Sequence, residues 1–160
     1  MNPKNNITVI IPAAGNGSRF GGSIPKQFLS LGDETVLEKS VNLFLEIPCI
    51  REVIVAIDSN ENLVKSQSFY NDARVRIVEG GNTRSESVFN ALAEVDQSIE
   101  IVVIHDAARP WLRKSHFEDL LSQLTNDQSV EGVFPVISAT DSLRPLQAIR
   151  TRSSNFFTKG

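Results

Sequence analysis

Short runs of aliphatic and β-branched residues alternate with amphipathic segments along most of the chain. The runs are residues 7–11, 52–57, 75–78, 101–105 and 132–137. Continuous apolar runs of this length are typical of strands that are buried on both faces. Strands that alternate with helices form βαβ units, whose right-handed crossovers place helices on both sides of a parallel sheet. The pattern therefore predicts an α/β fold, with a mainly parallel sheet between two layers of helices.

Four segments are expected to form those helices: residues 36–47, 61–70, 83–95 and 117–124. The second of them has the weakest apolar stripe. Thr35 and Asn82 precede the first and third segments and are candidate N-caps. Ser115 and Glu118 have the spacing of a capping box at the start of the fourth.

Composition limits the class of protein. Hydrophobic residues make up 41% of the 160 residues, which suits one folded domain with a sizeable core. The formal net charge of -3 argues against a general nucleic-acid binder. The single cysteine, Cys49, cannot form an intramolecular disulfide and fits a reducing compartment. Because the sequence also shows no signal peptide and no apolar run long enough to cross a bilayer, we expect a cytoplasmic protein without nucleic-acid or membrane partners.

A glycine-rich loop follows the first apolar run, in the stretch PAAGNGSRFGGSIPKQF over residues 12–28. Gly15 and Gly17 leave backbone N–H groups open to the close approach of an anion. Arg19 adds a planar fork of donors, and Lys26 adds a compact positive charge. An ordinary flexible connection would not need both cations, so we interpret the loop as a polyphosphate site.

Two better-known phosphate loops are excluded by spacing. The dinucleotide fingerprint needs a third glycine where Phe20 stands, and the Walker pattern needs lysine followed by serine or threonine where Ser23 and Ile24 stand. Asp58 is the one candidate for the acidic ribose-binding residue of a dehydrogenase. A dinucleotide-dependent dehydrogenase is therefore disfavoured.

The loop over residues 79–87 follows the third expected strand. Ligands of open α/β sheets bind beyond the carboxyl ends of the strands, where this loop would lie. Gly81 brings backbone close, while Asn82 and Ser87 offer the mixed donors and acceptors that can read the edge of a base. The alternative for Asn82 is a capping role alone. Arg84 is expected to be a surface charge or to act behind the residues that touch the ligand.

A third loop, residues 106–113, follows the fourth expected strand. Asp106 would sit at the carboxyl end of that strand, where a carboxylate can hold Mg²⁺ among phosphate oxygens; a turn or capping role is the alternative. Arg109 is a candidate for binding a second anion. We interpret His105 as a packing or hydrogen-bonding residue of the strand and not as a metal ligand.

Four stretches together resemble the 2-C-methyl-D-erythritol 4-phosphate cytidylyltransferase family. They are residues 12–28, 78–88, 105–110 and 139–144, in that order. The resemblance implies a Rossmann-like nucleotidyltransferase fold and a homodimer, with the nucleotide-binding core over residues 1–137 and the start of a dimerisation arm over 138–160. It also implies that the protein joins CTP to 2-C-methyl-D-erythritol 4-phosphate and releases pyrophosphate, in non-mevalonate isoprenoid synthesis, with Mg²⁺ or another divalent cation.

The same resemblance assigns residues. Arg19 and Lys26 fall on positions that stabilise the transition state, and Arg152 on the arm arginine that reaches the acceptor phosphate of a partner subunit; Arg150 is the alternative for that arginine. The cytosine-reading positions correspond to Ala13, Ala14, Gly81, Asn82 and Ser87, while Gly15 and Gly17 belong to the expected phosphate loop. Asp106, Ala107 and Arg109 lie near the ribose, the metal and the acceptor, with Asp106 as the metal ligand. Ser142 stands where the family commonly has a threonine that contacts the acceptor, and Asn82 where an aspartate is common.

Two alternatives to this function stay open: a ribitol-5-phosphate cytidylyltransferase and a truncated, noncatalytic nucleotide-binding protein. Family members carry further acceptor-binding segments, which have no counterpart before Gly160. We therefore expect this chain to be a fragment of a single nucleotidyltransferase domain. On its own it should bind CTP·Mg²⁺ weakly and be nearly inactive, because half of the acceptor site would be missing.

Overall fold

The computed structural model describes residues 6–15, 24–127 and 129–136. Contacts along the chain define two compact units, Met1–Glu118 and Asp119–Gly160. The sheet and all the candidate site residues that the structure describes belong to the first unit. The assignment of residues 1–160 to one domain, and of residues 138–160 to a dimerisation arm, stays a prediction.

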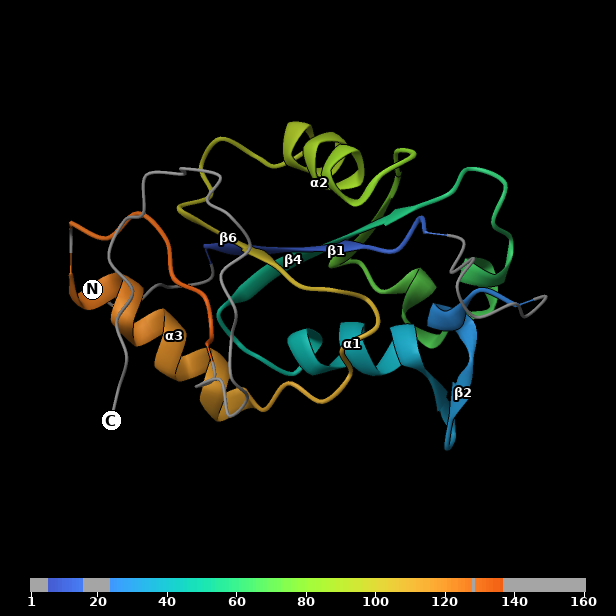
Figure 1. Cartoon of the computed structure of the whole chain (residues 1–160), viewed down its shortest axis with the longest axis horizontal. Helices are drawn as coiled ribbons and strands as arrows, with labels where there is room; N and C mark the ends of the chain where they lie inside the picture. The colour runs from blue at the N-terminus through green and yellow to red at the C-terminus, as the bar shows by residue number, and fades with distance from the viewer. Residues whose placement is uncertain (1–5, 16–23, 128, 137–160) are drawn as a thin grey trace, which may run out of the picture. The chain divides into compact units, whose positions relative to one another are not determined.

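Four parallel strands form the central sheet (Figure 1). They are β1 (Ile7–Pro12), β4 (Ile50–Ile57), β5 (Val75–Glu79) and β6 (Ile101–Ile104), in the spatial order β5-β4-β1-β6. β1 pairs with β4 on one side and with β6 on the other, and β5 pairs with the outer side of β4. The predicted α/β fold with a mainly parallel sheet is therefore confirmed, and four of the five apolar runs form strands. The expected burial on both faces was wrong for β6, in which Ile104 is 46% exposed.

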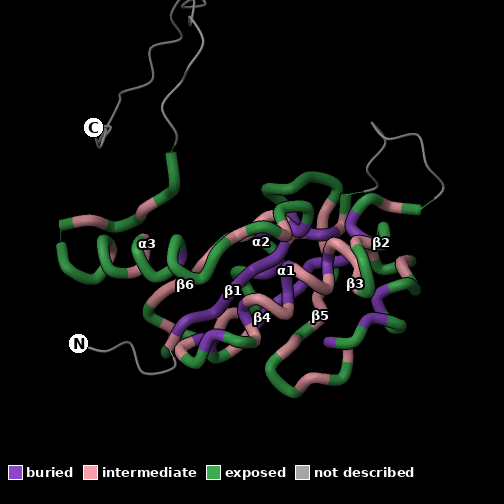
Figure 2. Tube along the Cα trace, turned by 90° about the horizontal axis from the view of Figure 1, so that it is seen from below, coloured by how far each residue is buried: buried purple, intermediate pink, exposed green. Residues whose placement is uncertain are grey.

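Helices α1 (Val36–Leu45) and α2 (Arg84–Ala93) lie on opposite faces of this sheet (Figure 1). On the α2 face, Ile10 of β1 and Ile54 of β4 pack in one buried cluster with Ala91 of the helix. β1 and β4 are the most buried strands, as Figure 2 shows. Burial on both faces explains why these strands read as continuous apolar runs instead of alternating ones.

Both helices begin with the same reciprocal capping box. Thr35 accepts a hydrogen bond from the Glu38 backbone N–H, which confirms it as the predicted cap of α1, and the Glu38 carboxylate accepts one from the Thr35 N–H. At α2 the cap is Thr83, paired in the same way with Glu86. The prediction of Asn82 as cap was wrong by one residue, because it is the Thr83 hydroxyl that accepts the hydrogen bond from the Glu86 N–H.

Residues 61–70 do not form the expected α-helix. They form two short 3-10 helices, η3 (Leu63–Ser66) and η4 (Ser68–Asn71). Gln67 separates them with an extended backbone, and its buried side chain accepts a hydrogen bond from Thr35 and donates one to the Leu63 carbonyl. The tertiary contact with Thr35 and the local bond to Leu63 fix Gln67 in this conformation, which interrupts the weak helical pattern.

Helix α3 (Lys114–Asn126) begins one residue before the expected cap Ser115. The Arg113 carbonyl already accepts hydrogen bonds from the N–H groups of His116 and Phe117, so Ser115 lies inside the helix. No described helix is long and apolar enough to cross a bilayer.

The fifth expected strand was also wrong over the part that the structure describes. Residues 132–136 form no strand, and residue 137 lies outside the described ranges. Phe134 and Val136 are 67% and 56% exposed, so the apolar run packs into no sheet there. β-branched composition predicts a strand only where a pairing neighbour exists.

One small element was not predicted: an antiparallel pair of β2 (Ser30–Leu31) and β3 (Glu34–Thr35). Its turn uses Gly32 at φ +74°, a conformation that favours glycine. The preceding 3-10 helix, η2 (Lys26–Phe28), returns the chain from the glycine-rich loop.

Candidate functional site

The order of the strands marks where a ligand should bind. From β1 the chain moves outward to β4 and β5, and it then crosses back through α2 to β6 on the other side of β1. Such a reversal opens a crevice at the carboxyl ends of the strands, which is the usual ligand site of open α/β sheets. The loops that follow β1, β5 and β6 all leave the sheet at this edge.

The first loop is anchored at its start by a buried glutamine. The Ala13 N–H donates to the carbonyl of Ala56 in β4 at 2.7 Å. Gln27, 4% exposed, donates from Nε2 to the carbonyls of Ala13 at 2.7 Å and Gly15 at 3.2 Å. The adjacent Lys26 is exposed. Gln27 thus ties the segment that carries Lys26 to the end of β1.

The second loop touches the first. The Gly80 N–H donates to the Ile57 carbonyl at 2.7 Å, and a Cβ added to Gly80 would collide with the Cβ of Ala14. The side chain of Ser87 is buried within the loop: its Oγ accepts from the Gly81 N–H at 3.0 Å and donates to the Thr83 carbonyl at 3.0 Å.

These bonds fix the backbone on both sides of Asn82, whose side chain is exposed. The Asn82 N–H donates to the Glu86 carboxylate at 2.7 Å. Ser87 therefore shapes the loop whether or not it also reads a base, and recognition of cytosine by Gly81, Asn82 and Ser87 stays a prediction.

The third loop centres on Asp106, whose two carboxylate oxygens are each held by an arginine. The Nε of Arg84 lies 2.7 Å from Oδ1, and the Nε of Arg109 lies 2.9 Å from Oδ2. Partial burial alone would raise the pKa of Asp106, but the hydrogen bond from Arg84 and the charges of both guanidinium groups outweigh it and leave the pKa lowered. Asp106 is therefore ionised at neutral pH.

The residues beside Asp106 hold this loop against the sheet and α1. The His105 ring packs edge-to-face on Phe44, with 5.1 Å between centroids, and its Nε2 lies 3.0 Å from the Arg109 carbonyl. Burial lowers the pKa of His105, which the bond to that carbonyl only partly offsets, so the ring is neutral and donates. The prediction of a structural role for His105 is confirmed. The buried Ala107 accepts a hydrogen bond from Ser40 of α1.

A divalent cation bound by Asp106 stays a prediction at this edge of the sheet. Within the described ranges, no three His, Cys, Asp or Glu side chains are grouped so that they could hold an ion. Mg²⁺ commonly binds through one or two carboxylates plus phosphate oxygens and water. Asp106 supplies such a carboxylate, although both of its oxygens already face a guanidinium group.

The structure thus brings together ten of the predicted site residues: Ala13, Ala14, Gly15, Lys26, Gly81, Asn82, Ser87, Asp106, Ala107 and Arg109. Arg19, Gly17, Ser142 and Arg152 lie outside the described residues. Sequence reasoning missed the anchoring roles of Gln27 and Ser40, and left Arg84 as a surface or supporting charge. For Gln27 a signal existed, since it directly follows Lys26 in the same motif; nothing in the sequence singles out Ser40.

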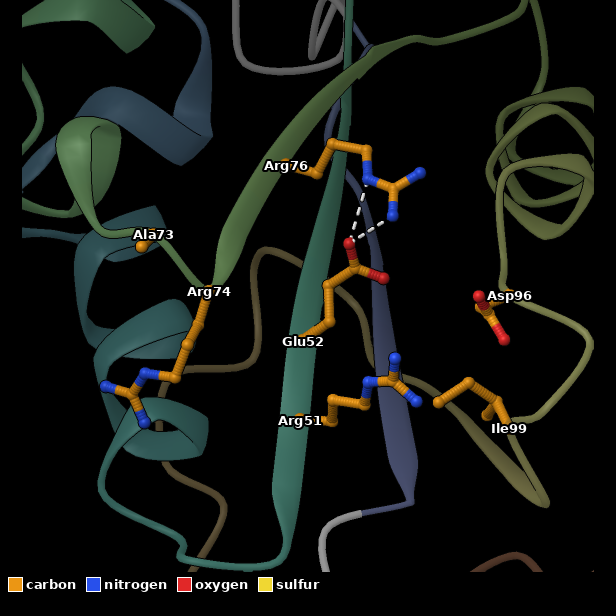
Figure 3. Close-up of a pocket in the computed structure, with 7 residues that line it drawn as sticks. All are labelled: Arg51, Glu52, Ala73, Arg74, Arg76, Asp96 and Ile99. Carbon is orange, nitrogen blue, oxygen red and sulfur yellow. Dashed lines mark hydrogen bonds and ion pairs between the residues drawn. The ribbon is translucent and has the colours of Figure 1, made fainter.

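A hollow of about 220 Å³ lies among residues at the amino ends of β4 and β5; Figure 3 shows the side chains that line it. It is lined by Arg51, Glu52, Ala73, Arg74, Arg76, Asp96 and Ile99. Its arginines are engaged within the protein: Arg76 donates from Nε to Glu52 at 2.8 Å, and Arg51 bonds Ser98 at 3.0 Å. Because it lies near the amino ends of β4 and β5, away from the switch point, we assign it no ligand.

Known proteins with similar sequences point to one family. A sequence profile described as 2-C-methyl-D-erythritol 4-phosphate cytidylyltransferase matches residues 7–152. The protein of that name from Haemophilus ducreyi is 39% identical over 137 residues, which are 86% of this chain and 59% of the relative. The one from Blochmanniella pennsylvanica is 41% identical over 132 residues, which are 81% and 54% of the two chains. This chain spans little more than half the length of these curated relatives.

Solved structures agree. The crystal structure of the Francisella tularensis 2-C-methyl-D-erythritol 4-phosphate cytidylyltransferase matches with a TM-score of 0.64 at 35% identity, over 78% of this chain and 54% of that one. The 4-diphosphocytidyl-2C-methyl-D-erythritol synthase of Anaerococcus prevotii matches with a TM-score of 0.65 at 27% identity, over 78% and 53%. The aligned part includes the greater share of the residues described here.

Proposed function

Because the chain belongs to the 2-C-methyl-D-erythritol 4-phosphate cytidylyltransferase family, we propose that it binds CTP at these three loops and transfers the cytidylyl group to 2-C-methyl-D-erythritol 4-phosphate. One observation carries the proposal: the base loop packs on the phosphate loop through Gly80 and Ala14, and is bridged to the acceptor loop through Arg84 and Asp106. Residues assigned separately to base, phosphate and acceptor thereby meet at one edge of the sheet.

The reaction needs no covalent intermediate on the protein. An oxygen of the acceptor phosphate forms a bond to the α-phosphorus of CTP, while the bond from that phosphorus to its bridging oxygen breaks and pyrophosphate leaves. The protein's part is to align the two phosphates and to neutralise charge that builds in the transition state. Lys26, and Arg19 from the resemblance, are the cations proposed for the α-phosphate.

The remaining groups position the two substrates. Gly81, Asn82 and the Ser87-braced loop would face the cytosine, and Arg109 would attract the acceptor phosphate. Mg²⁺ or another divalent cation, held by Asp106 and the triphosphate, would supply further neutralisation of negative charge when bound. We also propose a cytoplasmic homodimer, in which Arg152 of one subunit would reach the acceptor phosphate of the other.

The experiment measures pyrophosphate release by the protein produced from its own gene, with CTP and either 2-C-methyl-D-erythritol 4-phosphate or ribitol 5-phosphate. Faster release with the first acceptor supports the proposal, and faster release with the second assigns the protein to the ribitol-5-phosphate enzymes. Binding of CTP without release from either acceptor would identify a noncatalytic nucleotide-binding protein.

A calorimetric titration tests the base separately. Cytosine has an exocyclic amine donor where uracil has a carbonyl, so a pocket that accepts from that amine should bind CTP more tightly than UTP. We expect a preference of at least roughly 1–3 kcal/mol, the cost of a mispaired buried polar group. Equal affinities would contradict the assignment of Ala13, Ala14, Gly81, Asn82 and Ser87 to the base.

A further inference from the structure

One side chain bridges the base loop and the acceptor loop. Arg84 is the first residue of α2, and its Nε donates to Oδ1 of Asp106, 22 residues later, at 2.7 Å. The other carboxylate oxygen lies 2.9 Å from the Nε of Arg109, three residues along the same loop. The carboxylate is therefore held between a local arginine and one from a separate element.

Both ends of the bridge are anchored. The backbone of Arg84 follows Thr83, whose capping box with Glu86 fixes the start of α2. The turn after Asp106 is held by the bond from Ser40 to the Ala107 carbonyl. The ion pair thus joins two fixed backbones, which distinguishes it from a contact between two mobile loops.

The contact is too exposed to be explained by stability. The side chains of Arg84 and Asp106 are 59% and 30% exposed, and ion pairs with this much exposure contribute little to folding stability. What the bond does determine is orientation, since a carboxylate that accepts a different guanidinium at each oxygen cannot rotate without breaking one of them.

We propose that Arg84 is a positioning residue for cytidylyl transfer, which orients the Asp106 carboxylate and, through it, the guanidinium of Arg109. The inference rests on the proposed function. Its consequence is that the loop facing the base sets the geometry of the groups facing the ribose and the acceptor, so that nucleotide and acceptor are aligned by one connected set of side chains.

The effect should appear in the rate and not in nucleotide affinity. Arg84 acts behind Asp106 and is not needed to contact CTP, whereas misplacing reacting groups by about 1 Å costs on the order of 10²-fold in rate. We expect Arg84→Ala to lower kcat by about tenfold or more while KM for CTP changes by less than about threefold. Arg84→Lys keeps the charge without the planar fork, so its kcat should lie between those of Arg84→Ala and the wild type.

The test combines Arg84→Ala with Asp106→Asn in a double-mutant cycle on pyrophosphate release. If Arg84 acts through Asp106, its substitution should have little further effect once Asp106 is changed. Arg51→Ala is the matched control, because Arg51 is an exposed arginine at the far end of β4 that bonds only Ser98 among the described residues. Melting temperatures of Arg84→Ala and Arg51→Ala should both stay near the wild-type value.

The outcomes separate the two claims. An active wild type with unchanged kcat in Arg84→Ala, or with additive effects in the cycle, overturns the positioning role and leaves the proposed function standing. A wild type that forms no product overturns the proposed function and this inference with it. If Arg84→Ala is unstable, Arg84→Met, which keeps most of the side chain's length but has no donor, decides: wild-type kcat in that variant would also overturn the role.

Discussion

The Oγ of Ser40 lies 3.0 Å from the backbone carbonyl of Ala107, across 67 residues of sequence, and it shares its one proton between that carbonyl and the Val36 carbonyl at 3.1 Å. Ser40 is fully buried on α1, and Ala107 directly follows Asp106. A helix on one face of the sheet thereby holds the loop that presents the carboxylate and Arg109 at the edge of the sheet. The site depends on a contact that neither segment reveals in its own sequence.

Replacing Ser40 with alanine should destabilise the fold. The Ala107 carbonyl would lose its donor in a buried position, and an unsatisfied buried polar group costs about 1–3 kcal/mol. The free energy of unfolding in urea measures this cost. Thr8→Val is the matched control: Thr8 is also fully buried, but its Oγ1 has no hydrogen-bond partner among the described residues. Thr8→Val should leave the free energy of unfolding unchanged or raise it. A similar decrease in both variants would contradict a stabilising role for the Ser40 hydrogen bond.

The strands and the first helix could be predicted because their signals are local. The buried runs of β1 and β4 and the Thr35–Glu38 capping box each lie within a few residues. The errors came where distant contacts decide. Gln67 splits the expected helix over residues 61–70 because its side chain bonds Thr35, 32 residues away. The residues 132–136 have strand composition but form no strand.

The residues of the candidate site also divide into those that local sequence can predict and those whose roles depend on distant contacts. Lys26 and Asp106 could be predicted as site residues from the motif and from the charge that a phosphate site needs. Gln27, Ser40 and Arg84 act by bonding other residues of the loops, and these partners are 14, 67 and 22 positions away in sequence. Roles of this kind become visible only when the fold has placed the partners together.

Gln27→Leu should weaken both the fold and CTP binding. The substitution removes the donor that serves the Ala13 and Gly15 carbonyls, so we expect a loss of about 1–3 kcal/mol in unfolding free energy. The loop would also lose its fixed start, which should raise the Kd for CTP. Gln67→Leu controls for stability, because Gln67 is similarly buried and bonded but braces η3 and Thr35 instead. Equal CTP affinity in the two variants would argue against anchoring of the phosphate loop by Gln27.

Lys26→Ala should lower kcat far more than it weakens CTP binding. Charge on the α-phosphate builds mainly in the transition state, and loss of one preorganised donor costs roughly 10²–10³ in rate. Steady-state kinetics with CTP and 2-C-methyl-D-erythritol 4-phosphate give kcat and KM separately. Lys65→Ala, at an exposed lysine in η3, should behave as wild type. Near-normal kcat with a raised KM in Lys26→Ala would assign Lys26 to ground-state binding alone.

Stability should fall as the pH drops below about 6.5, the ordinary pKa of histidine. Burial lowers the pKa of His105, with the Arg109 carbonyl and the charge of Asp106 opposing that shift. Below about pH 6.5 the unfolded chain therefore binds more protons than the folded chain, and the free energy of unfolding decreases until the folded-state pKa is passed. Carboxylates with lowered pKa, such as Asp106, add a further loss only at more acidic pH, below about 4.

Urea denaturation between pH 7.5 and pH 5, as an experimental range, checks this dependence. In His105→Gln the free energy of unfolding should depend less on pH above the range where carboxylates titrate. This holds even if the variant is less stable overall because it loses the contact with Phe44. A slope that survives in His105→Gln would place the responsible group elsewhere.

Gly80→Ala tests whether the base loop and the phosphate loop must touch. An added Cβ would overlap the Cβ of Ala14 and lie 3.1 Å from the Ser87 Oγ and 3.3 Å from the Ile57 carbonyl. The Gly80 N–H is bonded to that same carbonyl at 2.7 Å, so the backbone cannot retreat without losing the bond. Overpacking of this kind costs about 1–3 kcal/mol, and the strain should be relieved by spreading the two loops. We therefore expect lower unfolding free energy together with a higher Kd for CTP.

Gly132→Ala has open space around its added Cβ and should change neither quantity. Wild-type CTP affinity in Gly80→Ala, with stability reduced, would show that the close approach serves the fold and not the nucleotide site.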